Sequence, residues 1–300
     1  MIKLFAALLV TLIAMSACSS DSPEEKPVSN GGAFVYQLQG YANGRLDEIA
    51  AAPFRMAVID LARDASHAYF TASEIGAVKA SGKKVLAYFE IGAIENFRPE
   101  YAAVKDSSLM LNEWPSWPGE FFVRYWEQQW WDIAVRPRLD RALEAGFDGV
   151  YLDTPLAYEE IELNRVPTLT REELGARMAS LIVRISGYAK RVKSGFSIFP
   201  QNNPELQKYP GFVDAIDGIG MEELVFQATD QPCTADYCAE NLQGARELRK
   251  AGKTVLAIDY ANQPVNIANA CRRYRDEGFE GYVTVRALDR ISAPCPPNPR

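Results

Sequence analysis

The chain has 300 residues, with 32 Lys and Arg against 39 Asp and Glu, and therefore a net charge of −7 at pH 7. This acidic balance, without a basic stripe, argues against a nucleic-acid-binding protein. The single histidine, His67, lies in a polar stretch where we expect a surface position, which argues against a Ser-His-Asp hydrolase and against histidine-ligated metal chemistry. Because no G-x-G-x-x-G or Walker motif is present, we expect neither a cofactor nor a metal.

The first 18 residues are typical of an export signal. Lys3 precedes an apolar stretch at 4–15, which is too short for a membrane span of about 20 residues. The sequence MSAC, ending at Cys18, resembles a bacterial lipobox, so we expect Cys18 to be lipidated; an ordinary secretory signal cleaved nearby is the alternative. The lipid anchor predicts a location in the cell envelope. Because Ser19 rather than Asp follows the cysteine, we expect the outer membrane in a host with two membranes. Residues 19–32 are rich in Ser, Pro, Gly and charge, which predicts a disordered linker.

Eight short β-rich runs follow, each succeeded by helix-compatible sequence. Near-continuous Val, Ile, Leu, Tyr and Phe predicts strands that are buried on both faces, as in parallel sheets. Eight such strands predict an α/β fold consisting of one (β/α)8 barrel over residues 33–290, with a Pro-rich tail at 291–300. The runs are AFVYQL (33–38), MAVIDL (56–61), KVLAYFEIG (84–92), GVYLD (149–153), FSIFPQN (196–202), DGIGMEE (217–223), TVLAIDY (254–260) and GYVTVR (281–286).

Long helices are predicted between these runs, and each ends at a glycine. Thr170 and Glu173 have the spacing of a capping box, and Pro137 predicts a kink or break in its helix. The predicted helices cover residues 71–82, 125–146, 170–195, 241–252 and 265–278.

Four cysteines remain after Cys18. An even number in an exported chain predicts two disulfides, for which three pairings are possible. The short separation of Cys233 and Cys238 favours a local bond, which leaves Cys271 to pair with Cys295; a zinc site is the alternative.

Tryptophans gather in the segment 112–132. Trp130 and Trp131 lie in a predicted helix at near-helical spacing, so we expect core packing for them. Trp114 and Trp117 lie in a Pro-rich stretch, where stacking on sugar rings and simple loop packing are both open.

Carboxylates stand at the ends of several predicted strands, where a barrel places its chemistry. Glycosidic hydrolysis needs two of them, and the best candidates are Asp153 and Glu222. Capping of the next helix is the alternative for Asp153, although the loop that follows delays that helix. Glu223 competes with Glu222 because a one-residue slip exchanges which side chain faces inward. Glu90 is a weaker candidate for a functional residue, and the alternative is a structural partner of Arg98 or Arg286.

Several blocks resemble, in sequence and in order, glycoside hydrolase family 114, which contains secreted endo-α-1,4-polygalactosaminidases and bacterial relatives. The resemblance covers about residues 33–290. The blocks include VLAYFEIGAIENFRPE (85–100), GFDGVYLDTPLAYE (146–159), FPQNNPEL (199–206), DGIGMEELVF (217–226), VLAIDYA (255–261) and GYVTVRALDR (281–290).

The resemblance implies a (β/α)8 barrel that hydrolyses an α-linked galactosamine-containing polysaccharide with a carboxylate pair. Asp153 falls on the aspartate of the family's GFDG-x-x-x-D motif, and Glu222 falls on the glutamate of its sixth strand. An acid that relatives carry directly after a glycine stands here at Glu90 instead. The positions expected to line the sugar subsites are Glu90, Glu95, Arg98, Tyr151, Gln201, Asn202, Glu223, Asp259, Tyr260 and Arg286.

Two functional hypotheses follow. The first is an exported, lipid-anchored glycoside hydrolase with a two-carboxylate mechanism. The second is a catalytically weak or inactive carbohydrate-binding lipoprotein on the same barrel, since fold alone does not decide activity. In both, the expected partner is a polysaccharide, in particular a cationic amino-sugar polymer suited to an acidic protein. We expect contact with the membrane only through the lipid anchor, and a monomer.

Overall fold

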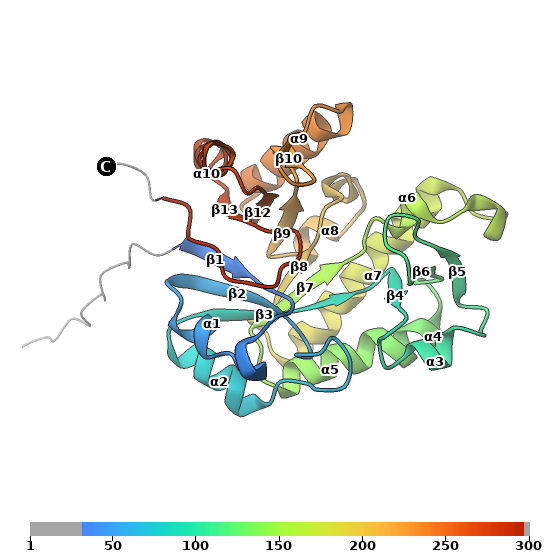
Figure 1. Ribbon diagram of the computed structural model, residues 1–300. Helices are drawn as coiled ribbons and strands as arrows, with labels where there is room; N and C mark the ends of the chain where they lie inside the picture. The colour runs from blue at the N-terminus through green and yellow to red at the C-terminus, as the bar shows by residue number, and fades with distance from the viewer. Residues whose placement is uncertain (1–31, 297–300) are drawn as a thin grey trace, which may run out of the picture.

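Eight parallel strands form the centre of the structure, a computed structural model that describes residues 32–296 (Figure 1). All eight predicted strands are confirmed, with ends that differ by a few residues. They are β1 (Gly32–Tyr36), β2 (Phe54–Asp60), β3 (Lys84–Glu90), β7 (Gly149–Asp153), β8 (Ser197–Pro200), β9 (Gly218–Glu222), β12 (Thr254–Tyr260) and β13 (Glu280–Thr284).

The strands close into a barrel. Two hydrogen-bonded ladders run in the orders β1-β2-β3-β7-β8 and β9-β12-β13. A parallel bridge between Gln201 and Gly220 joins β8 to β9, and β13 packs against β1, so the first and last strands lie side by side (Figure 1). Since all eight strands are parallel, their carboxyl ends meet at one rim, where the predicted (β/α)8 fold places its chemistry.

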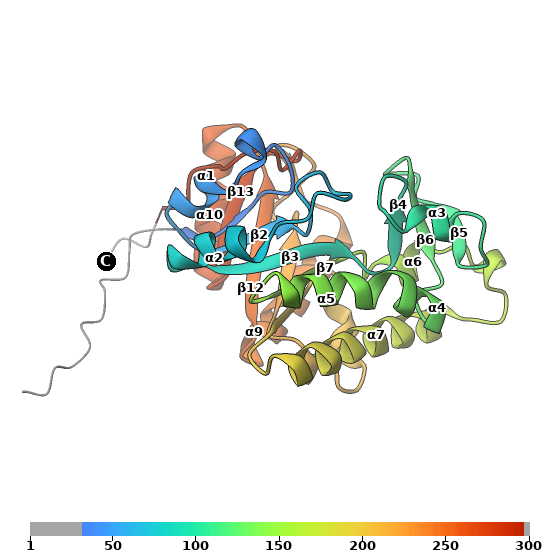
Figure 2. The same cartoon turned by 90° about the horizontal axis from the view of Figure 1, so that it is seen from below.

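Helices cover the outside of the barrel, and α5 and α7 run alongside each other on one side of it (Figure 2). The longer helices of the described residues are α2 (Ala72–Ala80), α5 (Arg136–Glu144), α7 (Arg171–Val192), α9 (Asp236–Lys250) and α10 (Pro264–Glu277). Shorter ones are α1 (Asp47–Ala51), α3 (Tyr101–Val104), α4 (Gln128–Trp130), α6 (Ala157–Glu160), α8 (Phe212–Ala215) and the 3-10 turns η1 (Ala42–Gly44), η3 (Leu163–Arg165) and η4 (Pro204–Lys208).

Local signals in the sequence account for several helix boundaries. The predicted capping box of Thr170 and Glu173 is present in both directions at the start of α7. The break expected at Pro137 is also found, because a π-helical turn, η2 (Trp131–Val135), separates α4 from α5, where the proline occupies the first turn. Trp130 and Trp131 are buried as predicted. His67 is exposed, also as predicted.

A small antiparallel sheet between β3 and α4 was not predicted. Its strands β4 (Ala93–Glu95), β6 (Glu120–Val123) and β5 (Met110–Glu113) lie in that order. Together with α3 they form a lobe, residues 93–123, that stands to one side of the barrel (Figure 2). Strands of three or four residues are too short for a repeating pattern to appear in the sequence, which is why none of these three strands was predicted.

Two disulfides are present, Cys233–Cys238 and Cys271–Cys295, in the pairing that the sequence favoured. The second ties the tail to α10. The expected leader with its lipidation site at Cys18, nearly all of the expected linker, and residues 297–300 of the tail lie outside the described residues. Among the helices of the described part, none combines the length and apolarity needed to cross a membrane.

We predict that the Cys271–Cys295 disulfide stabilises the domain by about 3 kcal/mol, because it closes the longer loop and restricts the unfolded chain. The double substitution Cys271→Ser/Cys295→Ser should lower the free energy of unfolding by that amount in urea titrations without reductant. The matched pair Cys233→Ser/Cys238→Ser should lose less, about 2 kcal/mol. Four free thiols among these cysteines, found by mass mapping of protein purified without reductant, would contradict the prediction.

Candidate active site

A pocket of about 450 Å³ opens at the carboxyl ends of the barrel strands. The last residues of five strands reach it: Tyr36 of β1, Asp60 of β2, Asp153 of β7, Glu222 of β9 and Tyr260 of β12. Tyr88 of β3 lies beside them. Three carboxylates and three phenols therefore converge on one cavity from six different barrel strands.

Asp153 is the last residue of β7, and its two oxygens are both held. The Tyr88 hydroxyl donates to Oδ2, and the Thr154 backbone N–H donates to Oδ1 at 2.6 Å. Burial raises the pKa of Asp153 to about 6, although these two hydrogen bonds oppose the rise. The helix-capping alternative is wrong, because the side chain is held within the site and α6 begins only at Ala157, without any side-chain cap.

Glu222 is the last residue of β9, and it is held by two different donors. Gln201 Nε2 donates to Oε2 at 2.7 Å, and the Tyr260 hydroxyl donates to Oε1 at 2.6 Å. Burial raises the pKa of Glu222 to about 8, and the negative charge of Asp153 adds to the rise. Near neutral pH the site therefore favours an ionised Asp153 beside a protonated Glu222, the division of roles that acid–base chemistry requires.

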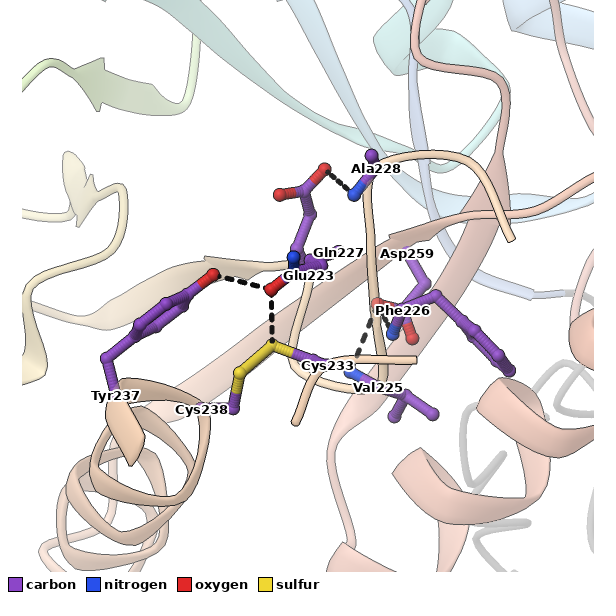
Figure 3. Close-up of a disulfide and its surroundings, with 9 residues drawn as sticks. All are labelled: Glu223, Val225, Phe226, Gln227, Ala228, Cys233, Tyr237, Cys238 and Asp259. Atoms are coloured by element: carbon purple, nitrogen blue, oxygen red, sulfur yellow. Dashed lines mark hydrogen bonds between the residues drawn. A yellow bond between two sulfur atoms is a disulfide. The ribbon is translucent and has the colours of Figure 1, made fainter. Parts of the chain in front are cut away.

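Glu223 borders the pocket as well, for a reason that simple strand alternation does not give. Its φ of 59° turns the chain out of β9, and its Oε1 accepts a hydrogen bond from Ala228 N at 2.8 Å (Figure 3). Ala228 belongs to a hairpin, residues 226–238, built on β10 (Phe226–Gln227) and β11 (Gln231–Pro232) and closed by the Cys233–Cys238 disulfide. We call it the disulfide hairpin.

Arg98 lies at the pocket wall among three carboxylates. Its guanidinium binds Asp60 at 3.0 Å, Glu90 at 2.9 Å and Glu95 at 2.8 Å. Burial acts to raise the pKa of Glu90, but the positive charges of Arg98 and Arg138 outweigh burial and hold this pKa below its ordinary value. The pKa of Glu95 rises to about 8, first through burial and then through the charge of Glu90.

Three of the predicted subsite residues do not reach the pocket, so that part of the prediction is wrong. Glu90 is 1% exposed and is committed to Arg98, which was its structural interpretation. Tyr151 is fully buried in the barrel against Gly220, where even a Cβ atom would collide with its ring. Asp259 is also fully buried, and it accepts hydrogen bonds from the backbone N–H groups of Val225 and Phe226 (Figure 3).

The other predicted subsite residues do line the pocket. Arg286 also lies over the Trp117 ring, 5.0 Å from its centroid, and Trp117 itself is 45% exposed. Both Trp114 and Trp117 border the cavity, so aromatic faces are available there for stacking on sugar. The predicted residues at the pocket are Glu95, Arg98, Asp153, Gln201, Asn202, Glu222, Glu223, Tyr260 and Arg286.

The sequence reasoning missed Tyr36, Tyr88 and Glu120. The two tyrosines stand at or near the ends of strands that were predicted, so strand position alone could have indicated them. Glu120 belongs to β6 of the lobe, opposite Glu95, and no barrel pattern points to it. Burial raises the pKa of Glu120 to about 10, and the charge of Asp153 contributes.

Comparisons with known proteins identify the family of this chain. The sequence profile of glycoside-hydrolase family GH114 matches residues 15–298. The chain belongs to family GH114. The resemblance stated from the sequence is thereby confirmed, and the protein is a glycoside hydrolase of this family. An uncharacterized protein from Deinococcus radiodurans is 33% identical over 310 aligned positions, which cover 95% of this chain and 97% of that protein.

Two solved structures share the fold of this GH114 protein. Ega3 from Aspergillus fumigatus, crystallised in complex with galactosamine, superposes with a TM-score of 0.68 at 19% identity, covering 88% of this chain and 96% of the Ega3 chain. The glycoside hydrolase domain of PelA from Pseudomonas aeruginosa gives a TM-score of 0.65 at 20% identity, covering 89% of this chain and 99% of that domain.

We predict that Glu120→Gln makes the stability of this GH114 protein less dependent on pH. The folded protein keeps Glu120 protonated up to a pKa of about 10, whereas the unfolded chain ionises it near about 4.3. The stability that protonated Glu120 contributes is therefore fully present below its pKa in the unfolded chain, and it is lost as pH rises toward its pKa in the folded protein. Glutamine does not titrate, so thermal unfolding at pH 5, 7 and 9 should show a smaller decline in the variant. Parallel declines in both proteins would contradict this.

Proposed function

We propose that this GH114 protein is an exported lipoprotein that hydrolyses an α-linked galactosamine-containing polysaccharide, with Asp153 and Glu222 as the two carboxylates. The observation that carries the proposal is their shared pocket, in which the pKa of Asp153 is about 6 and that of Glu222 about 8. A carboxylate and a carboxylic acid at one site are what glycosidic hydrolysis needs.

In the retaining form of the mechanism, the Asp153 carboxylate attacks the anomeric carbon while the bond to the glycosidic oxygen breaks. Glu222 gives its proton to that leaving oxygen. Glu222, now ionised, then takes a proton from water, whose oxygen attacks the anomeric carbon and releases Asp153. Tyr88, bonded to Asp153, and Tyr260, bonded to Glu222, would hold the two groups in position.

The retaining form requires the two carboxyl groups to be about 5–5.5 Å apart, whereas inversion requires about 6.5–9.5 Å. The anomeric configuration of the first product, followed by NMR, distinguishes the two forms. In the inverting form Asp153 acts as the base that activates water.

Three observations support the amino-sugar substrate. Asp153 and Glu223 bring negative charge to one pocket, where a cationic sugar is favoured. Ega3, which has the same fold, was crystallised with galactosamine. Trp114 and Trp117 supply faces on which sugar rings stack.

The proposal is tested with soluble protein that begins after residue 30, incubated with a panel of α-linked galactosamine polymers of different acetylation. We expect shorter oligomers, identified by mass spectrometry, from the galactosamine polymer. Binding without any cleavage across the panel would instead support the carbohydrate-binding lipoprotein that was the second hypothesis. If the protein neither binds nor cleaves any polymer of the panel, the proposed substrate class is wrong.

The lipid anchor gives a separate prediction. The multiply acylated cysteine of a bacterial lipoprotein holds a protein on the membrane far more firmly than a single acyl chain. We expect Cys18→Ala to move the protein from the membrane fraction to the soluble fraction of fractionated cells, with Ser19→Ala as the matched control that stays bound. Unchanged membrane retention of the Cys18 variant would contradict the anchor.

A further inference from the structure

A second cavity, of about 860 Å³, adjoins the active-site pocket. Four residues border both spaces, namely Leu156, Asn202, Glu222 and Glu223. The second cavity extends from them between η4 and α9. A chain bound at the catalytic carboxylates can therefore continue into this space, which we call the second groove.

The second groove carries an excess of negative charge. Its one lysine, Lys208, is already paired with Glu172 at 2.8 Å, outside the groove. Within the described residues, no ion pair neutralises any of its glutamates. These glutamates are Glu159, Glu205, Glu222, Glu223, Glu240 and Glu247.

Two of these glutamates lie close together and accept hydrogen bonds from the same uncharged side chains. Asn203 Nδ2 donates to Glu159 Oε2 and to Glu205 Oε1, each at 3.0 Å. The Tyr158 hydroxyl contacts both carboxylates as well. Partial burial and the neighbouring charge of Glu205 raise the pKa of Glu159 above its ordinary value. Because the donors shared by Glu159 and Glu205 are uncharged, a full negative charge on the two carboxylates has no cationic partner.

Asn203 supplies an independent observation that points to a ligand. Its side chain is 7% exposed, it lines the groove, and its Oδ1 accepts no hydrogen bond from the described residues. The amide cannot be turned around, because the two carboxylates accept hydrogen bonds only from its nitrogen. A buried carbonyl oxygen without a donor costs free energy, which a bound donor would relieve.

We propose that Glu159, Glu205 and Asn203 form a subsite that binds the ammonium group of a galactosamine unit, in a chain that extends from the active site. The inference rests on the proposed function and adds to it a position at which the unit must be deacetylated. An ammonium group has three N–H donors and a positive charge, which match two carboxylates and one amide oxygen. An N-acetyl group has one N–H and no charge, so it leaves the carboxylates unbalanced.

The test is binding of α-1,4-linked galactosamine octamer, measured by calorimetry. All proteins carry Asp153→Asn so that the octamer stays intact. One further carries Glu159→Gln/Glu205→Gln, in which the glutamine oxygens still accept from Asn203. The matched control carries Glu127→Gln/Glu144→Gln, which removes the same charge at exposed positions outside the groove. The fully N-acetylated octamer is the second probe.

We expect the Glu159→Gln/Glu205→Gln protein to bind the galactosamine octamer about three- to tenfold more weakly, the range of a partly exposed ion pair or two. The control protein should bind it unchanged, and affinity for the acetylated octamer should be the same in all three. An equal loss with both octamers, an equal loss in the control, or no loss would overturn the subsite.

The failure of the proposed function would look different. If the protein with Asp153 intact does not cleave the galactosamine octamer and no variant binds it, the substrate class falls and the subsite falls with it. If cleavage and binding occur but the glutamate pair has no effect, only the subsite is wrong.

Discussion

Asp153→Asn and Glu222→Gln should each lower kcat by about 10³-fold or more. General acid catalysis alone contributes about 10²–10⁴-fold, and loss of the nucleophile removes the covalent step as well. Both substitutions keep the shape of the side chain and its ability to accept from Tyr88 or Tyr260. Polymer binding, measured by calorimetry, should therefore remain close to that of the unmodified protein.

Glu223→Gln is the comparison for this pair. Its amide oxygen can still accept from Ala228, so the turn after β9 should persist and most activity should remain. If Glu223 proves essential and Glu222 dispensable, the assignment of the acid is wrong by one residue. If neither matters, the active site lies elsewhere.

Asp153 and Glu222 should also determine the pH dependence of kcat/KM. Activity should rise as Asp153 ionises around its pKa of about 6, and fall as Glu222 loses its proton around its pKa of about 8. The optimum therefore lies between these two values. A profile of initial rates from pH 4 to 10 that showed no decline on the alkaline side would contradict the role of Glu222 as the acid.

Arg98→Met should lower the free energy of unfolding by about 3–5 kcal/mol, because it leaves the buried carboxylate of Asp60 without its cation and that of Glu90 with only the more distant Arg138. Urea titration measures the loss. The control is Arg55→Met, which removes an exposed ion pair with Glu280 and should cost less than about 1 kcal/mol.

The charge explanation has a further test that holds even if Arg98→Met does not fold. The triple variant Asp60→Asn/Glu90→Gln/Arg98→Met removes the carboxylates together with the cation. If uncompensated charge is the cause, this variant should recover much of the lost stability. A triple variant no more stable than Arg98→Met alone would instead assign the loss to packing.

The barrel could be predicted because burial on both faces leaves a visible record in the sequence. A strand such as β12 is apolar almost throughout, and a capping box or a short cysteine loop involves residues near each other in the chain. Asp153 and Glu222 were found for the same reason, since each directly follows such a run. These features depend on local sequence and on one general property of barrels.

The direction in which polar residues point could not be predicted as well. Glu90 and Asp259 stand at or beside strand ends like Asp153, but Glu90 binds Arg98 of the lobe, and Asp259 binds a turn of the disulfide hairpin that is distant in sequence. Glu120 reaches the pocket only because the lobe folds. No local pattern records contacts that form only when separate segments meet.

The lobe also has a consequence for how such an enzyme can be re-engineered. Glu95, Trp117 and Glu120 all come from residues 93–123, whereas the proposed catalytic pair comes from β7 and β9. Exchanging this one segment for that of a relative would therefore replace a whole wall of the pocket at once and leave the chemistry in place. The graft must retain Arg98, because its two buried partners, Asp60 and Glu90, remain behind in the barrel.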